Sequence, residues 1–258
     1  MNIKYTLGAI VSIPLLPILY FQGKRIRKTI PKLPEASGIE GVFENGSQTS
    51  FQLITVGEST IAGVGAKFHK TAFTGTLAEE LAKQISANIS WKVYAKSGYN
   101  AQQVTNKIVK HIVEKPVDLI VIGLGGNDSF ELHSPKRWNK DIRALIARIR
   151  ESYPTSPIVF INMPPIKEFT AFTGAIKFVI GNLVLHLGKE LEKVVKDYKN
   201  VHYYAKALQY DDMISRLNVD AKPSDFFSDG VHPSELAYQI WAKDVAEFIQ
   251  RENILTKA

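Results

Sequence analysis

Two short stretches of the sequence carry the side chains of a candidate nucleophilic site. Ser59 stands in GEST (57–60), directly after an apolar run, while Asp229 and His232 are three residues apart in DGVH (229–232). At this spacing the Asp229 carboxylate can bind one ring nitrogen of His232, fix its tautomer and leave the other nitrogen to take a proton from Ser59. The spacing therefore predicts a nucleophile, a general base and an orienting carboxylate in the chain order Ser, Asp, His.

Hydrogen-bond donors for a tetrahedral intermediate are found after two further apolar runs, in SGYN (97–100) and GGND (125–128). We expect the backbone N–H groups of Ser59 and Gly98 and the side-chain amide of Asn127 to surround the oxyanion. Taken singly, each of these residues is more often part of a turn. Their joint presence on consecutive loops, each directly after an apolar run, favours a catalytic site.

Other kinds of site fit the sequence poorly. The glycine-rich stretch at 123–128 ends in Asp128, where a dinucleotide fingerprint needs glycine, and no GxxxxGK[ST] phosphate-binding motif occurs. Ile61 takes the place of the second glycine of a GxSxG nucleophile elbow. The chain has no cysteine, and its six histidines lack metal-ligand spacing. We therefore expect no metal and no organic cofactor.

Short apolar runs alternate with segments of helical period, which predicts a three-layer, doubly wound α/β/α domain over residues 49–258. We expect a mostly parallel sheet of five strands, because strands covered on both faces are apolar nearly throughout. The runs are FQLITV (51–56), WKVYA (91–95), VDLIVIGL (117–124), PIVFIN (157–162) and VHYYA (201–205). In such sheets ligands bind outside the carboxyl ends of the strands, where the candidate residues stand.

Apolar residues recur at helical spacing between these runs, so each predicted helix offers one apolar face to the sheet. They are Val104, Ile108 and Ile112; Ile142, Leu145, Ile146 and Ile149; Ile176, Ile180, Leu183, Leu187, Leu191 and Val194; and Leu236, Ile240 and Val245. Asn100 followed by Gln103 predicts a capping box at the start of the first of these helices.

The amino-terminal segment is uncharged over the 19 residues between Lys4 and Lys24, close to the ~20 that a membrane-spanning helix needs. We expect residues 1–23 to form an apolar helix that anchors the chain in a membrane, and residues 24–48 to form a basic linker. The basic residues after the helix favour a cytoplasmic catalytic domain. Pro14 and Pro17 leave open a bent helix that enters one leaflet only. A cleaved signal peptide and a buried helix of the domain are further alternatives.

The formal net charge of +7 is concentrated at the amino-terminal end. The first 36 residues carry +5 and the remaining 222 carry +2. A nucleic-acid-binding face needs its positive charge on the folded domain. We therefore expect no nucleic-acid partner, and the sequence indicates no particular oligomeric state.

The ordered set GEST, SGYN, GGND and DGVH resembles the four blocks of the SGNH, or GDSL-type, serine hydrolases over residues 50–250. The resemblance implies a flavodoxin-like fold. It also implies that Ser59 is the nucleophile, that Asp229 and His232 complete a triad, and that Gly98 and Asn127 are oxyanion donors.

The first block departs from the usual GDS, because Glu58 replaces the aspartate. The family aspartate mainly braces its loop, so we expect Glu58 to alter the geometry of this loop. If Glu58 lacked partners, Ser59 would be misplaced and the rate would fall.

The sequence and the resemblance together predict a membrane-anchored serine esterase that hydrolyses a small-molecule or lipid ester, such as a lysophospholipid, through an acyl-enzyme. The segment 163–172 is more apolar than a solvated loop, which makes Met163, Phe169 and Phe172 candidates for the wall of an acyl pocket or for a membrane contact. Two alternatives stay open. One is a glycan O-deacetylase with the same site, and the other is an inactive binding module, which the replacement at position 58 favours.

Overall fold

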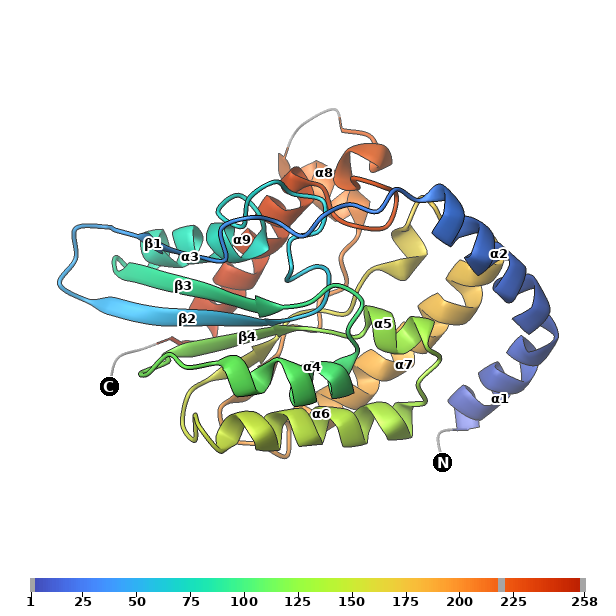
Figure 1. Cartoon of the computed structure of the whole chain (residues 1–258), viewed down its shortest axis with the longest axis horizontal. Helices are drawn as coiled ribbons and strands as arrows, with labels where there is room; N and C mark the ends of the chain where they lie inside the picture. Colours follow the sequence, from blue (N-terminus) through green and yellow to red (C-terminus); the bar gives the residue numbers. More distant parts are fainter. Residues whose placement is uncertain (1–2, 218–220, 256–258) are drawn as a thin grey trace.

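The computed structural model describes residues 3–217 and 221–255 (Figure 1). Residues 1–2 of the predicted anchor and residues 218–220 and 256–258 of the predicted domain lie outside this part. At the centre of the described part is a six-stranded sheet with the strand order β1-β3-β2-β4-β5-β6. The strands are β1 Glu40–Phe43, β2 Ser50–Gly57, β3 Asn88–Ala95, β4 Leu119–Gly123, β5 Ile158–Phe160 and β6 Val201–Tyr203.

Strands β2 to β6 correspond to the five predicted runs and are parallel to one another. Counted from β2, their order is 2-1-3-4-5, which is the order of flavodoxin-like sheets. The prediction of a doubly wound, mostly parallel sheet is therefore confirmed. In this topology the order reverses between β2 and β4, and the loops after these two strands open a crevice in which ligands bind.

Strand β1 is a sixth strand that the sequence analysis did not predict. It pairs antiparallel with β3, from Glu40 opposite Lys92 to Phe43 opposite Ile89, and an ion pair of 2.9 Å joins Lys92 Nζ to Glu40 Oε2. The strand lies within residues 24–48, which were expected to form a linker, and residues 24–29 belong to a helix. The structure thus differs from the expected linker in two segments. Residues 40–43 pair with the edge of the sheet, and residues 24–29 continue the amino-terminal helix.

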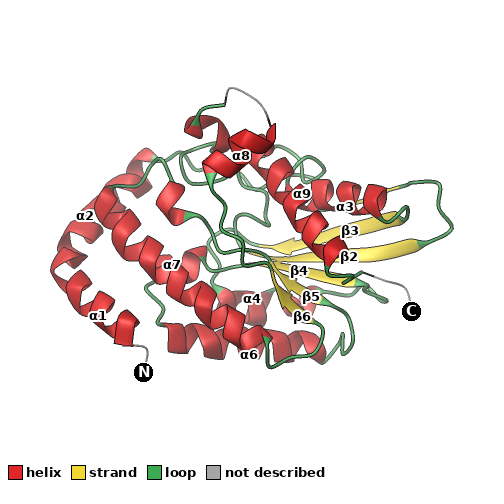
Figure 2. Ribbon diagram, turned by 180° about the vertical axis from the view of Figure 1, so that it is seen from behind, coloured by secondary structure: helices red, strands yellow, loops and turns green. Residues whose placement is uncertain are grey.

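Two layers of helices cover the sheet (Figures 1 and 2). Helices α3 Phe73–Gln84 and α9 Glu235–Arg251 pack on one face, and α4 Ala101–Lys107, α6 Pro135–Arg150 and α7 Gly174–Val195 pack on the other. Alternate residues of a strand point to opposite faces, so Leu53 packs with α3 and α9 while Ile54 packs on the other side. The predicted apolar faces of α6 and α7 are buried, and the predicted capping box at Asn100 is present.

The remaining short elements lie in the connections. They are η2 Val109–His111, α5 Gly126–Phe130, η3 Ile166–Glu168, α8 Tyr210–Leu217 and η4 Pro223–Phe226. Most of them follow the carboxyl ends of strands and therefore surround the crevice.

The amino-terminal helical segment consists of α1 Ile3–Ser12, the 3-10 turn η1 Ile13–Leu15 and α2 Leu16–Thr29. It runs beside α7 in both views (Figures 1 and 2). Leu15, Leu19 and Ile26 contact the apolar cluster of η3 and α7. The opposite side is exposed and apolar, with Leu7, Ile10, Val11, Ile13, Ile18, Tyr20 and Phe21. The helical stretch Tyr5–Ile26 is long and apolar enough to cross a membrane. A signal sequence would meet the same two criteria.

Candidate active site

Ser59 lies in a tight turn directly after β2. The strand ends at Gly57, where a side chain has no room, because a Cβ atom would lie 2.2 Å from the carbonyl oxygen of Gly123. The chain then reverses: the Ala62 N–H donates to the Glu58 carbonyl at 2.8 Å, and the Val64 N–H donates to the Ser59 carbonyl at 3.0 Å. The turn leaves Ser59 partly exposed at the carboxyl end of the sheet.

The loops after β3 and β4 carry the two other predicted donors. Gly98 follows β3 with a φ of +84°, and Gly125 caps α5 after β4 with a φ of +117°. Both conformations are left-handed and favour glycine. A Cβ atom on Gly125 would also lie 2.4 Å from Met163 Cε. Asn127 is the second residue of α5, so the short helix places its side chain beside the turn of Ser59.

Asp229 and His232 form a closely bonded pair in the loop before α9. The Asp229 side chain is fully buried, and its Oδ2 lies 2.7 Å from His232 Nδ1. Its Oδ1 accepts hydrogen bonds from the backbone N–H groups of Val231 at 2.9 Å and His232 at 2.8 Å. Burial alone would raise the pKa of Asp229, but the bonds from the His232 ring and from these N–H groups bring it below its ordinary value. The carboxylate stays charged and holds the ring by Nδ1, which leaves Nε2 for a substrate or a nucleophile.

One cavity brings the candidate residues together. Ser59, Gly98, Asn127 and His232 all line a cavity of about 290 Å³, close to the lower end of the range of about 300–1,000 Å³ for small-molecule sites. The remaining wall is largely apolar and includes Phe130, Phe169, Leu208, Met213, Phe226, Phe227, Val231 and Trp241. In the described part of the chain, Ser59 and His232 are not hydrogen bonded to each other. Such catalytic bonds are often long before substrate binds, so their pairing stays a prediction.

The structure separates the three predicted pocket residues. Phe169 lines the cavity, whereas Met163 and Phe172 do not. Met163 lies beneath Gly125, and Phe172 packs against Phe169 and Phe130 with ring centroids 5.2 and 5.8 Å apart. The expectation that Met163 and Phe172 line the pocket therefore needs correction: neither faces the cavity, and Phe172 packs behind the wall residues Phe169 and Phe130. Their expected membrane contact stays a prediction.

Several residues of the wall were missed by the sequence analysis. Leu208 and Met213 come from the segment around α8, Phe226 is the last residue of η4, and Phe227 follows it. The only sequence signal for them is the aromatic pair directly before the DGVH stretch. A short apolar pair beside a candidate base is a weak signal, because such pairs also occur in ordinary cores.

Glu58 is buried and well bonded. Its Oε1 accepts from the Gly126 N–H at 2.7 Å, and its Oε2 accepts from the Asn127 N–H at 2.9 Å and from the Asn127 side-chain amide. Burial raises the pKa of Glu58 to about 7 although these bonds lower it, and the carboxylate of Asp128 raises it further. The longer side chain at position 58 thus has partners, so the sequence-based concern that it would lack them does not apply.

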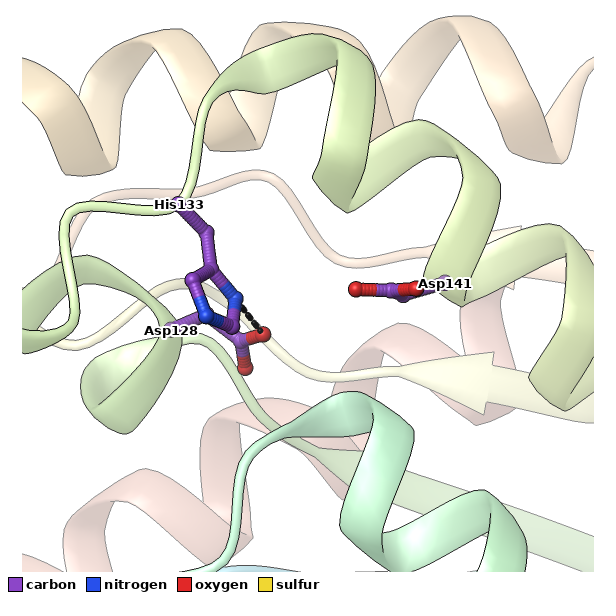
Figure 3. A group of neighbouring side chains, drawn as sticks. All are labelled: Asp128, His133 and Asp141. Carbon is purple, nitrogen blue, oxygen red and sulfur yellow. Dashed lines mark hydrogen bonds and ion pairs between the residues drawn. The ribbon is translucent and has the colours of Figure 1, made fainter.

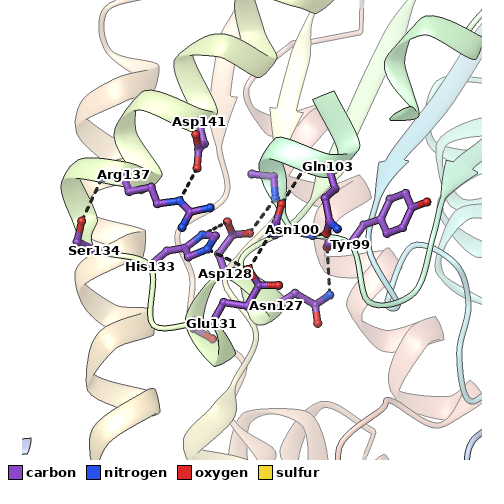
Figure 4. A network of polar contacts seen from close by, with 12 residues as sticks. Tyr99, Asn100, Gln103, Asn127, Asp128, Glu131, His133, Ser134, Arg137 and Asp141 are labelled. Carbon is purple, nitrogen blue, oxygen red and sulfur yellow. Dashed lines mark hydrogen bonds and ion pairs between the residues drawn. The ribbon is translucent and has the colours of Figure 1, made fainter. Parts of the chain in front are cut away.

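A second polar cluster joins the Gly98 loop to the Asn127 loop (Figure 4). Asp128 accepts from the Ala101 N–H at 3.0 Å, and its Oδ1 lies 2.9 Å from His133 Nδ1. Glu131 Oε2 lies 3.0 Å from His133 Nε2 and accepts from Asn100 Nδ2 at 2.8 Å. These contacts link the start of α4 to α5, so they hold the two donor loops side by side.

The same cluster contains three potential metal ligands. Atoms of Asp128, His133 and Asp141 lie within 4.8 Å of one another (Figure 3). Both ring nitrogens of His133 already contact carboxylates, and Arg137 Nε lies 3.5 Å from Asp141 Oδ2. A metal would need a free ring nitrogen. These contacts, together with the bonds from Ala101 and Asn100, account for the cluster as a brace between loops.

Comparisons with known proteins agree with this architecture. The model of the GDSL-like lipase/acylhydrolase family matches residues 55–240. A similar solved structure is a lipase from a goat rumen metagenome, with 19% identity and a TM-score of 0.53 over 76% of this chain and 96% of that one. The crystal structure of TesA has 15% identity and a TM-score of 0.58, over 78% of this chain and 98% of that one. A family 3 carbohydrate esterase from Clostridium thermocellum has 15% identity and a TM-score of 0.58, over 81% of this chain and 100% of that one. No curated protein matches the sequence.

A flavodoxin-like sheet whose reversal point carries these polar loops is the architecture of SGNH hydrolases. The chain belongs to the GDSL-like lipase/acylhydrolase family, because the family match spans most of its length. It is an ester hydrolase, and the predicted relationship to SGNH hydrolases is confirmed. At identities this low, the solved structures support the fold alone.

Proposed function

We propose that this ester hydrolase is a serine esterase that acts on lipid or other acyl esters. The observation that carries the proposal is the single cavity that Ser59, Gly98, Asn127 and His232 line together with a largely apolar wall. Apolar and aromatic walls bind acyl chains by burying them, and a few polar groups orient the ester. A sugar, in contrast, needs hydrogen-bonding partners along the wall.

In the proposed mechanism, the Ser59 hydroxyl attacks the ester carbonyl while His232 Nε2 takes its proton. Asp229 stabilises the imidazolium that forms, because its carboxylate already bonds Nδ1. The tetrahedral intermediate places its oxyanion near the donors from Ser59, Gly98 and Asn127. It collapses as His232 gives the proton to the leaving alcohol. A water, deprotonated by His232, then attacks the acyl-enzyme and restores Ser59.

Replacing Ser59 tests the nucleophile. We expect Ser59→Ala to lower kcat for nitrophenyl acyl esters by about 10⁴-fold or more, because the covalent route is lost. Ser224→Ala is the matched control, since Ser224 is exposed and outside the cavity wall, and it should keep the activity of the native chain. Equal activity of Ser59→Ala and the native chain would refute the proposal.

The length of the preferred acyl group separates a lipid esterase from a glycan O-deacetylase. The glycan O-deacetylase is included as an alternative because a carbohydrate esterase has a similar fold. The apolar wall favours octanoyl over acetyl esters in kcat/KM, since each additional methylene that enters the wall gains transfer free energy. A preference for acetyl esters would instead favour the deacetylase.

We propose that α1 and α2 bind a membrane surface. One side of this segment rests on the domain, at η3 and α7, and the other side is apolar and exposed, which suits a helix lying in the interfacial plane. The neighbouring basic residues Lys24, Arg25 and Lys28 are exposed and attract anionic headgroups, which favours a cytoplasmic membrane face.

Vesicle flotation tests the membrane proposal. The full chain should float with phosphatidylserine-containing vesicles, and Ile10→Asp/Val11→Asp should weaken this binding while leaving soluble-ester hydrolysis intact. Ile39→Asp is the matched control, because Ile39 is an exposed apolar residue outside the helical segment. Flotation of the double variant equal to that of the native chain would argue against this surface.

A further inference from the structure

The three proposed oxyanion donors are not equally available. In the described part of the chain, the backbone N–H groups of Ser59 and Gly98 make no hydrogen bond with another residue. The Asn127 side-chain amide has two hydrogens, and both already have acceptors. One hydrogen is donated to Glu58 Oε2. The other is donated to the carbonyl oxygen of Tyr99 at 3.1 Å, a contact that Figure 4 shows. An oxyanion can therefore bind this amide only after one of these two bonds breaks.

We propose that Glu58 is a positioning residue that holds the Asn127 amide in a resting orientation and releases it to the oxyanion of the substrate. This inference rests on the proposed function of the site. It adds a second arrangement to that site: two donors are ready at rest, and the third becomes available when the Glu58 contact is released.

The geometry shows why this contact can open while the loop stays in place. Glu58 accepts two bonds from backbone N–H groups, those of Gly126 and Asn127, which are the first two residues of α5. Its third bond comes from the Asn127 side chain, which can turn about its own torsions. Glu58 Oε2 accepts both bonds from Asn127, so a proton on this oxygen would displace one of the two donors. The side-chain amide is the donor that can move.

Charge decides how strongly the amide is held. A hydrogen bond to a carboxylate is roughly twice as strong as one between neutral groups, so the ionised form of Glu58 holds Asn127 and the neutral form weakens that hold. The pKa of Glu58 is raised to about 7 by burial, and Asp128 on α5 adds to this rise. The other ionisable side chains that line the cavity are His232, which is paired with Asp229, and Glu168 of η3. Both forms of Glu58 are therefore populated near neutral pH.

The sign of the effect follows from these charges. Below about pH 7, Glu58 is mostly neutral and the amide is available to the oxyanion. As the pH rises through 7, the carboxylate forms and withdraws the amide. The contribution of Asn127 to kcat should therefore decrease with rising pH. A general base such as His232 acts in the opposite direction, because it must lose its proton to work.

The ratio of kcat between the native chain and Asn127→Ala isolates this effect, because both proteins use the same general base. With a short nitrophenyl ester, we expect a ratio of about 100 near pH 6, the usual value of one oxyanion donor. The ratio should fall at least about tenfold by pH 9 as the amide is withdrawn. A constant ratio of this size over the whole range would overturn the proposal, and so would a ratio near one at every pH.

Glu58→Asp provides the second test. The shorter side chain withdraws the carboxylate by roughly 1.5 Å, one C–C bond, which loosens its hold on Asn127. We expect kcat above pH 8 to rise severalfold with KM little changed, and we expect no such rise when Asn127→Ala is also present. Unchanged or lower kcat in Glu58→Asp, or the same change in both backgrounds, would mean that Glu58 acts through the loop structure, which overturns the inference.

Labelling with a fluorophosphonate separates failure of the inference from failure of the proposed function. Circular dichroism first checks that each variant is folded. If Asn127→Ala does not fold, the rise in kcat of Glu58→Asp above pH 8 in the native background remains the test. If the native chain is not labelled while Ser59 is intact, the nucleophile assignment fails and the inference fails with it. If Ser59 is labelled but the ratio of kcat values does not change with pH, only the inference fails.

Discussion

Two buried carboxylates near the same cavity behave in opposite ways: Glu58 lines the cavity, and Asp229 bonds His232, which lines it. Asp229 and Glu58 each accept hydrogen bonds from two backbone N–H groups. The third partner differs: Asp229 bonds an imidazole that can become positive, while Glu58 bonds the neutral amide of Asn127. Burial raises the pKa of Glu58 to about 7, while the His232 contact helps to bring the pKa of Asp229 below its usual value despite burial.

The comparison shows that a shared cavity does not give its acids a shared protonation state. A partner that can carry positive charge keeps a buried carboxylate ionised, whereas neutral donors and a nearby carboxylate allow it to keep a proton. Asp229 is thus suited to permanent charge, and Glu58 to an exchange of protons near neutral pH. Three predictions test this contrast.

The largest effect is expected from Asp229→Asn. An amide at this position cannot stabilise the imidazolium of His232 and favours the wrong ring tautomer, so kcat should fall by about 10⁴-fold. Asp225→Asn is the matched control, because Asp225 also accepts a backbone N–H bond, from Lys222 at 2.8 Å, but is exposed and outside the cavity wall. Steady-state hydrolysis of a nitrophenyl ester measures both. A loss smaller than tenfold in Asp229→Asn would remove Asp229 from its assigned role.

The second prediction concerns the stability that Glu58 contributes. Its pKa is about 7 in the folded chain against 4.5 in the unfolded chain, so the folded state binds the proton between these values and stability falls as pH rises. The free energy of unfolding of the native chain, relative to Glu58→Gln, should decrease by about 3 kcal/mol from about pH 4.5 to 7. Urea unfolding of both proteins measures this difference. A pH-independent difference would show that folding does not raise the pKa of Glu58.

The smallest expected effect is the contribution of Asp229 to the free energy of unfolding. Unlike that of Glu58, this contribution is lost at acidic pH. The folded pKa of Asp229 is below its ordinary value of 3.8, so its stabilising contribution is fully present above that value and is lost as pH falls through the folded pKa. Compared with Asp229→Asn, the native chain should therefore lose stability on acidification below about pH 4. Urea unfolding at acidic pH tests this. Loss of stability in the other direction, toward higher pH, would mean that Asp229 resembles Glu58.

Much of the fold was accessible from the sequence, because its determinants are local. Strands buried on both faces are apolar throughout, which made the five parallel strands visible, and the apolar faces of α6 and α7 repeat at helical spacing. Strand β1 was missed for the opposite reason. Only four residues long, it lies at an edge and alternates between exposed and half-buried positions, and only its pairing with β3 makes it a strand.

The candidate site was predicted in part. The loops after β2, β3 and β4 bring Ser59, Gly98 and Asn127 to one cavity, as the topology required. Which side chains face inward depends on how each loop turns, so Phe169 was anticipated while Met163 and Phe172 were misplaced. The sequence also could not predict that both amide hydrogens of Asn127 are hydrogen bonded, because this depends on how far the Glu58 side chain extends.

The contact between α2 and the domain affects how a shorter form of the protein should be designed. Leu15, Leu19 and Ile26 cover apolar surface next to Phe169, and Gln22 Oε1 accepts a hydrogen bond from Thr173, the residue that caps α7. A shorter form that lacks residues 1–29 would expose this apolar surface and would aggregate more readily during purification. A chain that starts at Leu15 would lose Leu7, Ile10, Val11 and Ile13 from the exposed apolar side. It would keep Leu15, Leu19 and Ile26 as the cover over the apolar cluster that contains Phe169.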